Sequence, residues 1–232
     1  MTENLIFLPG MMCDERLFEP QIKHLSNSFD IVTADLTTQT TIAGIAKSVL
    51  DTVKFDNFSL CGLSMGGIVA FELMKQAPER IHKVALLNTT HWADAPKNKP
   101  IREKQIELVN AGKLRDVIIE QMKPNYLAKQ NRDDTNLLNL LVEMAIDLGD
   151  EAFINQSLAL MSRQDYTSIL QDWAKPCLVL CGEEDELCPP ERHMEMHGLI
   201  GNAVLEIISG AGHISTLEQT DEINLLLTNF FI

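Results

Sequence analysis

Six short apolar segments, separated by stretches of helical periodicity, restrict this chain to very few folds. The segments have the length and composition of buried strands, and they lie at 5–8, 31–34, 58–61, 84–87, 177–181 and 204–208. Apolar side chains share one helical face in 41–50 and again in 221–230. Strands that alternate with helices predict an α/β fold, with a mostly parallel sheet of about six strands and helices on both faces.

The interval 89–173 interrupts this alternation. It contains no strand-like segment, and its helical patterns lie at 101–110, 113–122, 135–148 and 151–161. A block of this length between two strands is typical of an inserted helical cap rather than of a loop. The predicted domains are therefore a core formed by 1–88 and 174–232 and a cap formed by 89–173, above the sheet edge where α/β folds bind ligands.

A G-x-S-x-G pattern at 62–66 lies directly between the third predicted strand and a helical segment. This context is typical of a nucleophile elbow, a strained turn that exposes its serine. Gly62 and Gly66 let the neighbouring chain come close, and the N–H of Met65 lies at the positive end of the helix. Ser64 is therefore the candidate nucleophile.

A serine hydroxyl needs a base to take its proton and a third group to orient that base. His213 follows the sixth predicted strand, and the acidic turn 183–186 follows the fifth. Parallel strands place their carboxyl ends at one edge of the sheet, so we expect these groups to lie near Ser64. The residues themselves leave four candidates for the acid, which are Glu183, Glu184, Asp185 and Glu186.

These motifs, in this order, resemble those of the α/β-hydrolase superfamily over nearly the whole chain. The turn at 182–189 matches the superfamily pattern G-x-x-D-x-x-x-P, which selects Asp185 as the acid, and Gly212-His213 followed by Glu218 matches its terminal G-H segment. The resemblance therefore implies a catalytic triad of Ser64, Asp185 and His213.

The loop after the first strand implies an oxyanion hole. Residues 8–11 match the superfamily loop that supplies the second backbone donor, which implies Met11 beside Met65, with Met12 as the fallback. The superfamily loop often reads His-Gly, whereas this chain has Pro9-Gly10, so an orienting contact from that histidine is lost while backbone donation is kept. We also expect no antiparallel hairpin before the first strand, because that strand, at 5–8, begins almost at the N-terminus.

The resemblance implies a serine carboxylesterase that cleaves a small or medium acyl ester without a metal or an organic cofactor. It is similar to cap-bearing esterases that include the pimeloyl-carrier methyl esterase type. A thioesterase, a lactonase and a C–C bond hydrolase with the same triad are alternatives, and a ligand-sensing protein with negligible turnover is an alternative outside enzymes. His91, Trp92 and Met12 are candidates for the substrate pocket, although packing explains them as well.

Two further patterns have simpler explanations. His193 and His197 have the i, i+4 spacing of metal ligands, but an exposed polar helix face explains them and no metal is expected.

Residues 97–132 contain nine basic and four acidic side chains. This basic cap could steer an anionic substrate or an acidic acyl carrier protein, although lysine-rich exposed helices would look the same.

Composition excludes several partners. The chain has 19 basic and 33 acidic side chains and a net charge of −14, which argues against nucleic acid and anionic membrane surfaces. The sequence contains no signal-peptide pattern and no apolar run long enough to span a bilayer. The five cysteines include no C-x-x-C pair, so we expect reduced thiols and a cytoplasmic protein.

Overall fold

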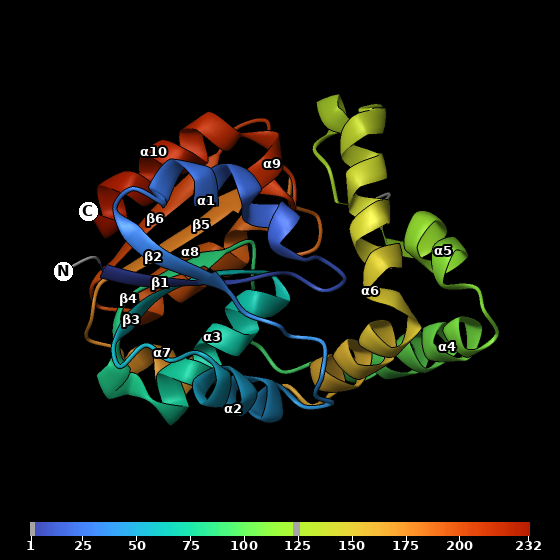
Figure 1. The fold of residues 1–232 in the computed structure, drawn as a ribbon, viewed down its shortest axis with the longest axis horizontal. Coiled ribbons are helices and arrows are strands. Elements are labelled where there is room, and N and C mark those ends of the chain that lie inside the picture. The colour runs from blue at the N-terminus through green and yellow to red at the C-terminus, as the bar shows by residue number, and fades with distance from the viewer. Residues whose placement is uncertain (1–2, 123–125) are drawn as a thin grey trace.

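All six predicted strands pair into one parallel sheet (Figure 1). The computed structural model describes residues 3–122 and 126–232. The strand order is β2-β1-β3-β4-β5-β6, and each neighbouring pair runs parallel. The strands are β1 (Glu3–Leu8), β2 (Phe29–Thr33), β3 (Phe58–Leu63), β4 (Ile81–Leu87), β5 (Cys177–Gly182) and β6 (Ala203–Ile208). The predicted α/β class and the number of strands are confirmed, and all carboxyl ends meet at one edge.

Helices cover both faces of the sheet because successive strand residues point to opposite sides. Ile6 and Leu8 belong to the cluster of α2 (Ile42–Thr52), α3 (Met65–Gln76), α7 (Thr167–Gln171) and α8 (Pro190–Leu199). Leu5 and Phe7 belong to the opposite cluster, with α1 (Glu19–Leu25) and α10 (Thr220–Phe231). Shorter elements of the core are η1 (Glu15–Phe18), η2 (Pro78–Arg80) and α9 (Ser215–Glu218), and η6 (Lys129–Asn131) lies within the predicted cap range.

The segment between β4 and β5 carries the predicted cap helices. Beside the sheet lie η3 (Pro96–Asn98), α4 (Lys99–Asn110), α5 (Leu114–Val117), the π-helical η4 (Ile118–Met122) and α6 (Thr135–Met161) (Figure 1). Gly149, at φ 81°, breaks α6 at the boundary that the sequence predicts between two helices. Helix α7 falls inside the predicted cap range but packs on α3 and α8 of the core.

Local sequence accounts for several helix ends. Thr41 caps α2 by accepting a hydrogen bond from the Gly44 N–H at 3.0 Å, and Asp134 caps α6 in the same way. Helix α3 ends at Gln76, two residues before Pro78, as predicted, because proline cannot continue a helix.

In the described part of the chain, no helix combines the length and the apolar character that a membrane span requires.

Candidate active site

The turn between β3 and α3 holds Ser64 in a strained conformation. Its φ of 55° and ψ of −115° lie where residues other than glycine are rare. A Cβ atom on Gly62 would approach the Gly66 carbonyl oxygen to 2.5 Å, and one on Gly66 would collide with the Leu8 carbonyl oxygen. Both positions therefore require glycine, and the turn presents the serine hydroxyl at the carboxyl edge of the sheet.

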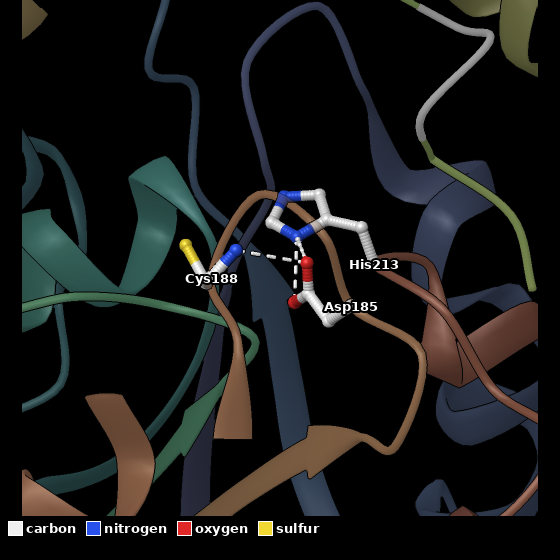
Figure 2. Close-up of side chains that lie close together, drawn as sticks. All are labelled: Asp185, Cys188 and His213. Atoms are coloured by element: carbon white, nitrogen blue, oxygen red, sulfur yellow. Dashed lines mark hydrogen bonds and ion pairs between the residues drawn. The ribbon is translucent and has the colours of Figure 1, made fainter. Parts of the chain in front are cut away.

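Ser64, His213 and Asp185 form one hydrogen-bonded chain at this edge. Nε2 of His213 lies 2.9 Å from Ser64 Oγ, and Nδ1 lies 3.0 and 2.9 Å from the two Asp185 oxygens. Figure 2 shows the imidazole facing the carboxylate. An ionised carboxylate only accepts hydrogen bonds, so we assign the proton to Nδ1. Nε2 is then the acceptor for the serine proton, which is the tautomer that a general base needs.

The four acids of the turn after β5 have different partners. Asp185 Oδ1 accepts the backbone N–H groups of Leu187 and Cys188, both at 2.9 Å. Burial alone raises the pKa of Asp185, but His213, the Cys188 N–H and the Asn88 side chain outweigh it and hold the pKa below its usual value. The remaining acids lie elsewhere: Glu183 binds the Ser209 hydroxyl, Glu184 the Lys129 N–H and Glu186 the Arg132 guanidinium.

Asn88, just past β4, supports the acid and has no sequence motif of its own. Its Nδ2 donates to Asp185 Oδ2 at 2.9 Å and to the Gly212 carbonyl at 3.0 Å, while its Oδ1 accepts from the Ser215 hydroxyl at 2.5 Å. Its φ of 47° lies in the left-handed region, where asparagine is enriched. Asn88 thus joins the acid turn to the histidine loop, and a polar residue at a strand end was its only sequence signal.

The N–H groups of Met65 and Met11 are the candidate oxyanion donors. Met65 begins α3, so its N–H has no acceptor within the helix, and both residues line the same cavity as Ser64. The Met12 N–H instead donates to Gln156 Oε1 of α6 at 2.8 Å. That bond removes Met12 as the fallback donor and ties the oxyanion loop to the cap, a role for Gln156 that the sequence did not reveal.

His193 is a structural residue in this arrangement. It is fully buried, and its Nε2 accepts the Thr89 N–H at 3.0 Å, while the Thr89 hydroxyl donates to the Ser64 carbonyl at 2.7 Å. Burial lowers the pKa of His193 to about 4, so the ring is neutral at pH 7. His197, one turn later, is exposed. The two rings therefore do not face a common ion.

Glu218 joins the histidine loop to the cap. Its Oε1 accepts the Gly212 N–H at 2.8 Å, and its Oε2 accepts the Ala128 N–H at 2.7 Å and Asn131 Nδ2 at 2.9 Å. The His213 N–H donates to the Tyr126 carbonyl at 2.7 Å. The loop that carries His213 is thus held by the segment that follows η4.

A cavity of about 400 Å³ opens onto Ser64, Met11, Met65 and His213. Among the described residues, its wall does not include Met12, His91 or Trp92, so these three do not lie where a pocket role requires. Met12 and His91 are fully buried, and Trp92 donates to Glu195 at the surface. Proximity in sequence to the strand ends therefore did not predict which side chains line the cavity.

Asp185, Cys188 and His213 place potential ligand atoms within 4.8 Å of one another (Figure 2). Both Asp185 oxygens and both His213 nitrogens already have hydrogen-bond partners in the triad. Burial raises the pKa of the Cys188 thiol well above its usual value, which disfavours the thiolate that a metal binds. The arrangement suits proton transfer between the imidazole and the serine.

A family model described as alpha/beta hydrolase fold matches residues 3–220. The 3-oxoadipate enol-lactonase 1 of Acinetobacter baylyi is 22% identical over 97% of this chain and 87% of its own length. A 2-hydroxy-6-oxononadienedioate/2-hydroxy-6-oxononatrienedioate hydrolase of Cupriavidus pinatubonensis is 28% identical over 80% of this chain and 66% of its own.

Solved structures share the fold. A thermophilic esterase from Thermogutta terrifontis, solved with malate bound, superposes with a TM-score of 0.92 at 23% identity, covering 99% of this chain and 89% of that one. The enol-lactonase from Burkholderia xenovorans superposes with a TM-score of 0.85 at 22% identity, over 99% and 91%. Identities this low show the architecture, and the chemistry must be argued from the site.

Proposed function

The chain belongs to the alpha/beta hydrolase fold family, and on that basis we propose that it is a serine carboxylesterase acting on a small or medium acyl ester. The observation that carries the proposal is the continuous chain Ser64 Oγ to His213 Nε2 and His213 Nδ1 to Asp185, at 2.9 to 3.0 Å. Hydrolysis as the general reaction agrees with the family and with its relatives.

The geometry supports an acyl-enzyme mechanism. Ser64 attacks the ester carbonyl while His213 takes its proton, and Asp185 stabilises the resulting imidazolium. The Met65 and Met11 N–H groups stabilise the oxyanion, and each such donor contributes about 3–4 kcal/mol in comparable sites. His213 then protonates the leaving alcohol. Water attacks the acyl-enzyme with His213 as its base, and the acid is released as Ser64 takes the proton back.

A lactonase is the second candidate, because it is favoured by the likeness to an enol-lactonase over 97% of the chain. A lactone is an ester whose alcohol stays attached, so the same residues would open it. The thioesterase and C–C hydrolase alternatives, and the narrower likeness to the pimeloyl-carrier type, stay predictions.

The test is multiple-turnover release of p-nitrophenol from acetate, butyrate and octanoate esters, with a lactone assayed in parallel. We expect turnover by the wild type and a loss of at least 1,000-fold in Ser64→Ala, because the nucleophile is removed. Ser168→Ala, on the exposed face of α7, is the control and should match the wild type. Undiminished turnover in Ser64→Ala would refute the mechanism, and a wild type without turnover on these substrates would favour the ligand-sensing alternative.

A further inference from the structure

Two arginines line the cavity beside the triad. Arg102 comes from α4 and Arg163 follows the end of α6, and their side chains are 18% and 12% exposed. Glu186, the acid in the same wall, is 53% exposed and binds Arg132 at 2.8 Å. The two arginines therefore lie where water screens charge poorly, whereas Glu186 is screened and already paired.

Asp94 balances only one of the two arginine charges. Its Oδ2 lies 3.1 Å from Arg102 Nε, and its Oδ1 lies 3.0 Å from a terminal nitrogen of Arg163. The Asp94 side chain is 6% exposed, so this cluster of two guanidinium groups and one carboxylate is enclosed. It retains a net charge of +1, which a single bound anion would neutralise.

The cluster also retains unused donors. Within the described residues, the terminal nitrogens of Arg102 have no hydrogen-bond partner, and Arg163 Nε is buried without one. Burial lowers the pKa of Arg163, as expected for a guanidinium with too few acceptors around it. A guanidinium with free terminal N–H groups matches the two oxygens of a carboxylate.

The two arginines and the triad share one cavity. Its wall includes Arg102 and Arg163 as well as Ser64 and His213. Tyr126, whose ring packs 5.5 Å from the His213 ring, and Cys188, beside Asp185 and His213, lie in the same wall. One ligand of modest size in the 400 Å³ cavity can thus contact both the cluster and the triad.

We propose that Arg102 and Arg163 form a carboxylate subsite, and that the substrate is an ester with a free carboxylate, such as the half-ester of a short dicarboxylic acid. This inference rests on the proposed hydrolase function and narrows its substrate class. Ser64 Oγ bonds to the ester carbonyl carbon, the alcohol leaves with the proton held by His213, and water cleaves the acyl-enzyme to the dicarboxylate. The free carboxylate stays on the arginines and undergoes no chemistry.

The first experiment compares monomethyl glutarate with the methyl ester of glutaramic acid, which has the same shape but carries an amide in place of the carboxylate. We expect the wild type to hydrolyse the carboxylate substrate with a kcat/KM at least tenfold higher, mainly through KM. In Arg102→Gln and in Arg163→Gln this ratio should fall close to one. Lys104→Gln, which removes one positive charge from the exposed face of α4, should keep the wild-type ratio.

A purely structural role for the arginines would lower turnover of both esters equally and leave their ratio unchanged, which would overturn the inference. A wild type that hydrolyses both esters with the same kcat/KM would also overturn the inference. That result would leave the proposed function unaffected.

Calorimetric titration of Ser64→Ala with glutarate and with glutaramide gives a readout that needs no turnover. We expect glutarate to bind at least tenfold more tightly than glutaramide, and Arg102→Gln in the same background to remove that preference. Glutarate binding of this kind in a protein whose wild type hydrolyses no ester would refute the hydrolase proposal and support the subsite. Equal affinity for the two compounds would overturn the subsite.

Discussion

Two buried residues near Ser64 show that hydrogen-bonding partners decide the charge state of a buried group. Asp185 is buried yet ionised, because His213 and three N–H donors face it. His193 is buried and neutral, because burial disfavours its charged form and its Nε2 accepts the Thr89 N–H. The same kind of burial thus produces opposite charge states, and the hydrogen-bonding partners decide which one holds.

The neutral state of His193 should make stability depend on pH. Its pKa is about 4 in the folded protein and about 6.5 when unfolded, so between these values the unfolded state binds more protons. The free energy of unfolding therefore falls as pH falls, by about 2 kcal/mol from pH 7 to pH 5 for this group. In His193→Gln, we expect urea denaturation at pH 7 and pH 5 to show a decrease smaller by that amount. His197→Gln, exposed on the same helix, is the control and should behave like the wild type. If His193→Gln lost as much free energy of unfolding as the wild type between pH 7 and pH 5, the neutral state assigned to His193 would be contradicted.

The packing of α3 against β1 decides whether the elbow can form. Gly66 lies in the first turn of α3, and its Cα faces the Leu8 carbonyl of β1 with no room for a Cβ atom. This close approach brings the loop after β1, with Met11, against Ser64. Two elements therefore jointly build the candidate oxyanion hole, and neither contains the whole of it.

Gly66→Ala should cost more than about 4 kcal/mol of stability, because backbone on both sides must move. Gly198→Ala is the matched control: it is also a helical glycine, and its added Cβ would meet nothing within 4 Å. We expect that control to gain about 0.5–1 kcal/mol, the usual helix preference for alanine. Thermal and urea denaturation of both variants would check this, and a Gly66→Ala protein as stable as the wild type would disprove the close contact.

Across the whole molecule, the loop of the candidate base His213 is held jointly by core and cap segments. Glu218 belongs to α9 of the core, yet it binds Ala128 and Asn131 from the cap segment as well as Gly212 beside the base. Gln156 of α6 holds the loop after β1 in a comparable way. The packing of the cap segment and the position of His213 are therefore coupled.

Glu218→Gln should weaken the link between the cap segment and the histidine loop. Three N–H donors share the two carboxylate oxygens of Glu218, and an amide has only one acceptor oxygen. Loss of one charged hydrogen bond costs about 1.5–3 kcal/mol, which corresponds to a fall in Tm of several degrees for a chain of this size. We expect kcat on p-nitrophenyl butyrate to fall about tenfold with little change in KM, since His213 shifts while the cavity remains. Glu222→Gln, exposed on α10, is the control; a wild-type kcat in Glu218→Gln would show that the loop does not need this support.

The strands, their parallel arrangement and the order of the motifs follow from the sequence, because side-chain periodicity and glycine requirements are local properties. The choice of Asp185 among four acids came from a motif, and the structure gives its physical basis in the donors that surround each carboxylate. Local pattern could not reveal Asn88, Gln156 or the Arg102–Asp94–Arg163 cluster. The partners of Asn88 and Gln156 lie 97 to 144 residues away, and Arg163 lies far along the chain from Asp94, so only packing brings them together.

The predicted pocket residues likewise show what local sequence cannot determine. His91 and Trp92 follow β4 closely in sequence. The direction of a side chain after a strand end depends on what packs against it, and here both side chains contact Glu195 of α8. By itself, the sequence determined the α/β sheet, the strained turn at Ser64 and the side of the sheet on which chemistry would occur. The tertiary structure alone decided which polar groups surround that serine, because burial and long-range contact, not chain order, govern hydrogen bonding and charge.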